Sequence, residues 1–168
     1  VLKNEKIASI TTIGTPHRGT PLANWALQQI EENTLIYKAI KLFGQDMKGW
    51  RFLKDLTPDN MKNLFNYKVM NKSRIKYYSF IGYGDQAKDM LSPPLRVPEH
   101  FMRSTGQIKN EDLTDGIVPE SSQKWGVVLG RLPLDHFEQV NHHVLNFSGS
   151  RGKGMVRDMY KMILSKIN

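Results

Sequence analysis

The amino-acid sequence predicts an α/β protein in which a mostly parallel β-sheet is flanked by helices. Short apolar runs that are typical of buried strands occur at residues 7–13, 75–81 and 127–129. The segments between these runs contain apolar residues at helical spacing. Strands that alternate with helices favour parallel pairing, because each helix can carry the chain back across the sheet.

Composition limits the class of protein. The chain has 168 residues, 39% of them hydrophobic, which suffices for one domain with its own core. The absence of cysteine excludes disulfides and thiolate catalysis. No apolar run approaches the roughly 18 residues of a membrane span. The net charge of +8 fits solvated helix faces or attraction to an anionic lipid surface. Without a base-reading module or a recurrent aromatic–basic pattern, we expect no nucleic-acid partner.

The first half of the chain begins with the strand predicted at residues 7–13, which ends at Gly14. A helix should follow, with Pro21 in its first turn, where a proline removes no helical hydrogen bond. Residues 30–54 alternate apolar and basic positions and predict one or two amphipathic helices. These helices are interpreted either as a lid over an active site or as ordinary core-facing helices.

The second half of the chain contains the other predicted strands. A helix should start at Thr57, as the N-cap, with Pro58 in its first position, and run to about Asn66. The segments after it are predicted, in order, as a strand at 75–81, a long surface excursion at 84–112, a short strand at 127–129, a helix from His136 to Leu145, a glycine-rich connector at 149–154 and a final amphipathic helix at 155–167.

Two polar residues stand on turns on either side of the third predicted strand. Asp115 lies in a turn that leads into the apolar residues Ile117 and Val118. His136 lies on a turn that enters a predicted helix. Ester hydrolysis needs a nucleophile, a general base and a group that orients the base. A parallel topology would bring these two loops to the same end of the sheet. They are therefore candidates for the acid and the base.

Other roles for these residues stay open on the local sequence. Asp-Gly is a common turn pair, so Asp115 also fits a turn aspartate. His136 also fits a surface or capping histidine. Asp112 and Asp135 are alternative orienting acids, although the side chain of Asp135 should diverge from that of its neighbour His136. His17 follows a strand and is a further candidate base.

Four blocks of sequence form an ordered set: Thr11–Thr20 (TTIGTPHRGT), Tyr77–Gly82 (YYSFIG), Thr114–Pro119 (TDGIVP) with the residues up to Gly126, and Asp135–Asn141 (DHFEQVN). Taken in this order, they resemble triacylglycerol lipases of the bacterial and fungal α/β-hydrolase type. In that family, similar blocks form the segment after the nucleophile elbow, the next core strand, the acid loop and the histidine loop.

The resemblance implies an α/β-hydrolase fold with Asp115 as the triad acid and His136 as the triad base. It implies hydrolysis of acyl esters of lipid type, with a lipid ester as substrate and transient contact with a membrane or lipid interface. The block around His17 is structural in the resembled family and shapes the floor beside the nucleophile. Arg18 is expected to hold a nearby carboxylate.

The serine of the triad has no counterpart in this sequence. In the resembled family it stands in a G-x-S-x-G elbow upstream of the first block, and no serine here has that pattern. Ser148 and Ser150 follow the histidine, which is the wrong order for this fold. Ser79 lies inside a predicted strand, and Ser121 and Ser122 are expected to cap a helix. We therefore expect the serine and the oxyanion-hole donor upstream of Val1.

Residues 1–168 would then be the C-terminal part of a single α/β-hydrolase domain whose early strands are missing. The sequence itself suggests this, because it opens on Val1 and enters a core-like strand at once. The alternative is a non-catalytic lipid-binding or interaction protein on the same scaffold. A G-x-S-x-G motif shortly upstream would favour the enzyme, and a natural start near Val1 without one would favour the alternative.

A calcium ion is the only cofactor that the resemblance suggests, and none is required by the chemistry. Some of these lipases bind calcium through an acidic residue two positions after the histidine, which here is Glu138. Carboxylate oxygens suit calcium. A second acidic ligand would come from Asp85, Asp89 or Asp112. The alternative for Glu138 is a solvent-exposed helix residue.

Overall fold

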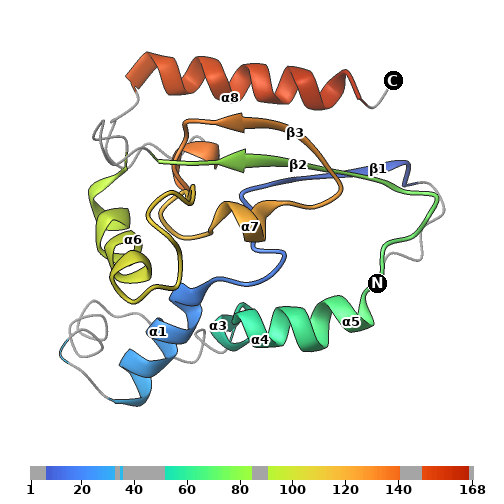
Figure 1. Ribbon diagram of the computed structural model, residues 1–168. Coiled ribbons are helices and arrows are strands. Elements are labelled where there is room, and N and C mark those ends of the chain that lie inside the picture. The colour runs from blue at the N-terminus through green and yellow to red at the C-terminus, as the bar shows by residue number, and fades with distance from the viewer. Residues whose placement is uncertain (1–6, 33–34, 36–51, 85–90, 141–148, 167–168) are drawn as a thin grey trace.

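A three-stranded parallel sheet forms the centre of the protein, as the computed structural model shows for residues 7–32, 35, 52–84, 91–140 and 149–166 (Figure 1). Its strands are β1 (Ser9–Ile13), β2 (Lys76–Gly82) and β3 (Val127–Leu132), and β2 lies between the other two. Both pairings are parallel, so the predicted α/β class with a parallel sheet is confirmed. Helix α8 (Gly149–Leu164) covers one face of the sheet, and the α-helices that precede it in the chain lie towards the opposite side.

Strand β3 is longer than predicted and contains a bulge. Tyr78 pairs with Val127, but Phe80 pairs with Gly130, so the register shifts between Ser79 and Phe80. One extra residue on β3 therefore has no counterpart on β2. Gly130 suits the position after the bulge, because a Cβ there would come within 3.2 Å of the Phe80 ring.

Two of the predicted helix starts are confirmed. Helix α1 (Pro21–Glu31) has Pro21 in its first turn, and its N-cap Thr20 accepts a hydrogen bond from the backbone N–H of Leu22 at 3.2 Å. Thr57 caps the later helix by accepting from the N–H of Asn60 at 3.3 Å. That helix consists of α4 (Pro58–Asn60), a π-helical turn η2 (Met61–Phe65) and α5 (Asn66–Lys68), and it follows the short helix α3 (Phe52–Asp55). Most of the segment 30–54 lies outside the described residues, so the lid hypothesis stays a prediction.

The surface excursion predicted for residues 84–112 is wrong in its central part. Residues Pro93–Ser104 form helix α6, whose face with Leu95, Glu99 and Met102 is buried. These residues have the i, i+4, i+7 spacing of a helix that packs on a core. The prolines of the segment and the charge of Glu99 concealed this period in the sequence. Two of the prolines are tolerated because they occupy the first turn, where no helical donor is lost.

The last described elements are α7 (Glu120–Gln123), the short 3₁₀ helix η4 (Glu138–Val140) and α8 (Gly149–Leu164). Of the helix predicted from His136 to Leu145, η4 is the part within the described residues. The prediction of a connector at 149–154 is wrong, because α8 begins at Gly149. Burial of Val156 and Met159 against the sheet offsets the helix cost of glycine, about 1 kcal/mol per residue.

The core between α8 and the sheet also supports the loop that follows β3. Its centre is formed by Phe80 of β2, Leu134 of that loop, and Val156 and Met159 of α8. Leu134 is fully buried and directly precedes Asp135 and His136. The histidine loop is therefore anchored by hydrophobic packing. Among the described helices, none combines the length and the apolar character that crossing a membrane requires.

Candidate active site

The acid loop joins α6 to α7 and is closed by an antiparallel bridge between Thr114 and Pro119. Asp115 lies inside this loop with no solvent exposure. Its Oδ1 accepts hydrogen bonds from the backbone N–H groups of Ile117 at 3.0 Å and Val118 at 2.7 Å. Asp115 is thus a turn residue as well as a candidate acid, because Oδ1 forms the turn and Oδ2 is left for another partner.

The acid loop is docked on the end of the sheet. The N–H of Gly84, two residues beyond β2, donates to the carbonyl oxygen of Thr114 at 2.8 Å. Gly116 has a φ of 94°, which favours glycine and lets the turn close. A Cβ at Gly116 would also lie only 2.7 Å from the Cβ of Leu95 on α6. The loop is therefore held between the sheet and α6.

The histidine loop begins with a capping box that involves Asp135 and Glu138. Oδ1 of Asp135 accepts from the backbone N–H groups of Phe137 and Glu138, each at 3.0 Å. In return, Oε2 of Glu138 accepts from the N–H of Asp135 at 3.0 Å. The remaining oxygen of Asp135 accepts from the backbone N–H and the hydroxyl of Ser92, at 2.8 and 2.5 Å. These bonds fix the turn that carries His136 and tie it to the residue before α6.

The structure brings Asp115 and His136 into direct contact. Nδ1 of His136 lies 2.8 Å from Oδ2 of Asp115, and the backbone N–H of His136 donates to the carbonyl oxygen of Asp115 at 3.0 Å. With the carboxylate ionised, the proton of a neutral imidazole lies on Nδ1, which leaves Nε2 as a proton acceptor. The His136 side chain is 34% exposed, and Nε2 has no hydrogen-bond partner among the described residues.

The surroundings of His136 favour its charged form. Burial on its own would lower the pKa of His136, but the hydrogen bond to Asp115 and the negative charges of Asp115 and Asp135 outweigh it. The pKa of His136 is therefore raised above its usual value. An imidazole next to a buried carboxylate can accept a proton during a reaction and hold it as a stabilised cation.

The two alternative orienting acids face other groups. Both oxygens of Asp135 are occupied by the capping box and by Ser92. Oδ2 of exposed Asp112 accepts from the backbone N–H of Lys109 at 2.9 Å. Asp115 is thus the one of the three candidates whose carboxylate contacts the imidazole of His136.

His17 lies in a different environment from His136. Its Nε2 is 2.9 Å from Oγ1 of Thr12, and its ring stacks on Trp125 with centroids 4.8 Å apart. Burial, with a smaller effect from the charge of Arg18, lowers the pKa of His17 to about 4. His17 is therefore neutral at pH 7, and its contacts are those of a packed residue.

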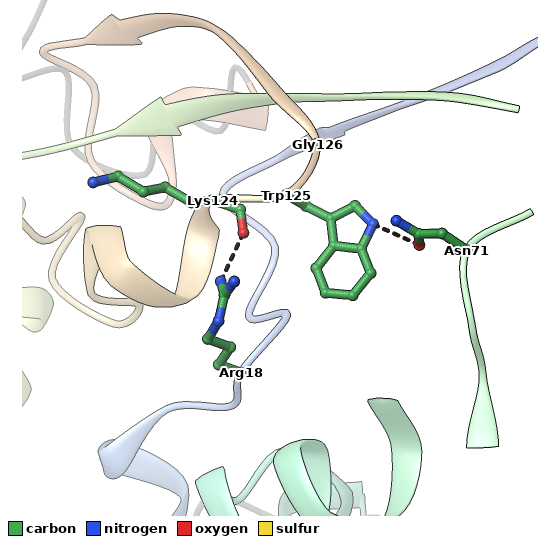
Figure 2. A pocket seen from close by; sticks show the side chains of 5 residues that line it. All are labelled: Arg18, Asn71, Lys124, Trp125 and Gly126. Atoms are coloured by element: carbon green, nitrogen blue, oxygen red, sulfur yellow. Dashed lines mark hydrogen bonds between the residues drawn. The ribbon is translucent and has the colours of Figure 1, made fainter. Parts of the chain in front are cut away.

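Among the described residues Arg18 holds no carboxylate, contrary to the sequence prediction. Its guanidinium donates to the carbonyl oxygens of Ser121 at 2.9 Å and Lys124 at 2.8 Å. Figure 2 shows Arg18 reaching Lys124 below the start of β3. The guanidinium thus satisfies carbonyl groups at the end of α7, where the helix leaves acceptors without partners.

A pocket of about 280 Å³ lies beside Arg18, and it is lined by Arg18, Asn71, Lys124, Trp125 and Gly126 (Figure 2). Nε1 of Trp125 donates to Oδ1 of Asn71 at 3.1 Å across this pocket. Trp125 and Gly126 directly precede β3, whereas His136 follows it. The pocket therefore lies at the opposite end of β3 from the Asp115–His136 pair, and its polar and basic lining does not suit an acyl chain.

Ser79 and Ser122 have structural hydrogen bonds. Oγ of buried Ser79 accepts from the backbone N–H of Trp125 at 3.1 Å. Oγ of Ser122 donates to the carbonyl oxygen of Gly19 at 2.6 Å and accepts from the backbone N–H of Arg18 at 3.0 Å. Ser121 and Ser122 lie within α7, which has Pro119 at its N-cap, so the expectation that they cap a helix is wrong.

Glu138 is not a solvent-exposed helix residue, which was its alternative role, because it is 5% exposed and closes the capping box. Its Oε2 is committed to a backbone N–H, which weakens its fit as a calcium ligand. The described residues contain no cluster of three or more acidic, histidine or cysteine side chains that could hold a metal. Asp85 and Asp89 lie outside the described residues, so calcium binding through Glu138 stays a prediction.

Gln139 is the site residue that the sequence motifs did not identify. Its Nε2 donates to Oδ2 of Asp115 at 3.0 Å, and its side chain is 3% exposed. One local signal was available, because Asp135 followed three residues later by Glu138 matches a capping box. A capping box predicts a short helical turn, which would place Gln139 on the same turn as His136.

Comparisons with known proteins bear on the fold of the chain. No family model matches the chain. The chain is 28% identical over 141 residues to triacylglycerol lipase 2 of Saccharomyces cerevisiae, a match that covers 83% of this chain and 39% of the yeast protein. The chain thus spans well under half the length of this curated relative.

Three solved structures resemble this fold at low sequence identity. Staphylococcus hyicus lipase matches with a TM-score of 0.69 and 16% identity, covering 98% of this chain and 57% of its own. A metagenomic carboxyl esterase matches with a TM-score of 0.57 and 18% identity, covering 79% of this chain and 37% of its own. Bacillus licheniformis lipase in its mature form matches with a TM-score of 0.51 and 21% identity, covering 81% of this chain and 50% of its own. The parallel sheet and these likenesses show that the chain has the α/β-hydrolase fold of these lipases and esterases, over about 37–57% of their length.

Proposed function

We propose that this chain supplies the acid and the general base of a lipase or esterase that hydrolyses acyl esters by a Ser-Asp-His triad. The observation that carries the proposal is the 2.8 Å contact between Nδ1 of His136 and Oδ2 of Asp115. Burial of the carboxylate and partial exposure of the imidazole support it, because the base must reach a reacting group while its partner stays fixed.

The proposed reaction proceeds in two balanced stages. Nε2 of His136 takes the proton of a serine hydroxyl as the serine oxygen attacks the ester carbonyl carbon. His136 then gives that proton to the leaving alcohol, and an acyl-enzyme remains. In the second stage, His136 takes a proton from water as the hydroxide attacks the acyl group, and then returns it to the serine. Asp115 orients the imidazole and stabilises its charge throughout.

The serine of this mechanism belongs to the full-length protein, upstream of Val1. The names of the yeast relative and of the structural neighbours support a lipid acyl ester as substrate. Contact with a lipid interface is part of the same proposal. The net charge of +8 is compatible with an anionic lipid surface.

Hydrolysis of p-nitrophenyl acyl esters by the full-length protein tests the proposal. We expect turnover by the wild type, labelling of one serine by a fluorophosphonate probe, and loss of turnover by orders of magnitude in a His136→Gln variant that keeps its fold. The purified 168-residue chain alone should hydrolyse no ester. A full-length protein without turnover or serine labelling would refute the proposal, as would a His136→Gln variant that is fully active.

A further inference from the structure

The side chain of Gln139 occupies a space formed by two glycines at the carboxyl ends of adjacent strands. Gly14 follows β1, and Gly82 ends β2. A Cβ at Gly14 would lie 2.1 Å from Oε1 of Gln139, and one at Gly82 would lie 2.0 Å from Nε2. Both contacts are far too short for any side chain, so the glutamine fits only because both positions are glycine.

From this space the amide of Gln139 reaches the oxygen that faces the imidazole. Its Nε2 donates to Oδ2 of Asp115 at 3.0 Å, and Nδ1 of His136 lies 2.8 Å from the same oxygen. The other carboxylate oxygen is held by the backbone N–H groups of Ile117 and Val118. Within the described residues, Gln139 is therefore the only partner of Oδ2 besides His136.

We propose that Gln139 is a positioning residue of the Asp115–His136 pair, which fixes the direction of Oδ2 towards the imidazole. This inference rests on the proposed function, because it assigns Gln139 a role in the same reaction. Gln139 touches neither the substrate nor the reacting atoms in this role. It acts through Asp115.

A neutral donor is the chemically suitable partner at this position. A lysine or arginine would neutralise Asp115 and reduce its stabilisation of the imidazolium. An apolar side chain would leave a buried carboxylate oxygen with the imidazole as its single partner among the described residues, which favours rotation of the acid away from the base. The amide satisfies one lone pair of Oδ2 and adds no charge.

The backbone couples Gln139 to the base. The backbone N–H of Gln139 donates to the carbonyl oxygen of Asp135 at 3.1 Å, which closes the turn that starts at the capping box. His136 and Gln139 therefore lie on one turn, and each sends a donor to Oδ2 of Asp115. The distance between base and acid is set by this turn as well as by the imidazole.

A Gln139→Met variant of the full-length protein tests the inference, because methionine keeps the length of the side chain and removes the donor. We expect kcat for p-nitrophenyl esters to fall roughly 10- to 100-fold while KM changes little, since the lost bond acts on the acid and not on the substrate. We also expect the low-field proton NMR signal of His136 Nδ1–H to move or broaden, because its acceptor has lost a partner.

Gln123 offers a matched control. It is equally buried, and within the described part of the chain its amide bonds only backbone groups, namely the N–H and carbonyl of Gly82 and the carbonyl of Val118. Gln123→Met should lower the melting temperature at least as much as Gln139→Met. It should leave the Nδ1–H signal of His136 in place. A purely structural role of Gln139 would make the two variants alike in both measurements.

A second variant, Gln139→Glu, separates charge from volume. It keeps the shape of the side chain but places a carboxyl group against Asp115, so we expect it to lower kcat more than Gln139→Met does. If volume alone mattered, Gln139→Glu would be the milder change. Folded Gln139 variants with wild-type kcat and an unmoved Nδ1–H signal would overturn the inference. The NMR signal needs no substrate, so this result is distinct from a failure of the wild type to hydrolyse esters.

Discussion

His136 contacts Asp115 through two separate bonds, one from its backbone N–H to the Asp115 carbonyl at 3.0 Å and one between the imidazole and the carboxylate at 2.8 Å. The backbone bond positions the histidine loop against the acid loop, and the side-chain bond then sets the orientation of the ring. The loops that follow α6 and β3 thus form one unit. The hydrophobic core around Leu134 anchors the loop that follows β3.

Replacement of Asp115 by asparagine should reduce kcat on ester substrates by about 10³- to 10⁴-fold. The asparagine NH₂ group can take the place of Oδ2 and donate to Nδ1 of His136, which favours the tautomer with its proton on Nε2. Steady-state kinetics of the full-length protein measure this loss. Asp112→Asn is the matched control, since Asp112 is exposed and its carboxylate bonds only a backbone N–H in the described part of the chain. Equal kinetics for the two variants would exclude Asp115 as the triad acid.

The acid limb of the pH profile of ester hydrolysis should have its midpoint above the ordinary histidine pKa of about 6.5. The pKa of His136 is raised, because the bond to Asp115 and the charges of Asp115 and Asp135 outweigh the effect of burial. A protonated imidazole cannot accept the serine proton, so activity should increase as pH rises through the raised pKa. A profile of kcat/KM against pH that declines only well below 6 would contradict this assignment.

Acid should destabilise the fold through His17. The pKa of His17 is about 4 in the folded chain and about 6.5 when unfolded, so the unfolded state binds more protons between these values. The contribution of His17 to the free energy of unfolding is therefore fully present above about 6.5 and is lost as pH falls towards 4. Urea midpoints of the wild type and a His17→Phe variant, measured at pH 7 and pH 4.5, test this.

The His17→Phe variant keeps an aromatic ring against Trp125 and cannot titrate. It should lose less stability between the two pH values than the wild type. The raised pKa of His136 acts in the opposite direction, since it favours the folded state at low pH, but both proteins share this effect. An identical pH dependence of the two proteins would show that His17 titrates normally in the fold.

Two glycines with positive φ should respond differently to alanine. Gly106→Ala should cost roughly 1–2 kcal/mol, because φ is 68° and a Cβ there meets no atom within 4 Å. Gly126→Ala should cost clearly more, because a Cβ would also lie 2.1 Å from the carbonyl oxygen of Tyr77 in β2. Chemical unfolding of both variants measures the difference. Equal losses would mean that the start of β3 can move away from β2.

Local patterns in the sequence determined the strands and several helix starts. Apolar runs define β1 and β2 to within one or two residues, and Thr57 with Pro58 defines the start of α4. These features depend on residues close together in the chain, so they can be predicted without knowledge of the tertiary structure. Helix α6 was missed because the buried charge of Glu99 and its prolines hide a period that only packing reveals.

For the candidate site, the sequence by itself determined which residues stand on the two loops, Asp115 and His136, because each lies in a distinctive motif. Only the tertiary structure decided how these residues meet and what supports them. The contact of Gln139 with Asp115 needs space from Gly14 and Gly82, which are 68 positions apart in the printed sequence and come together only when β1 pairs with β2. No local pattern encodes such a contact, because its geometry depends on the strand register and on the close approach of separate loops.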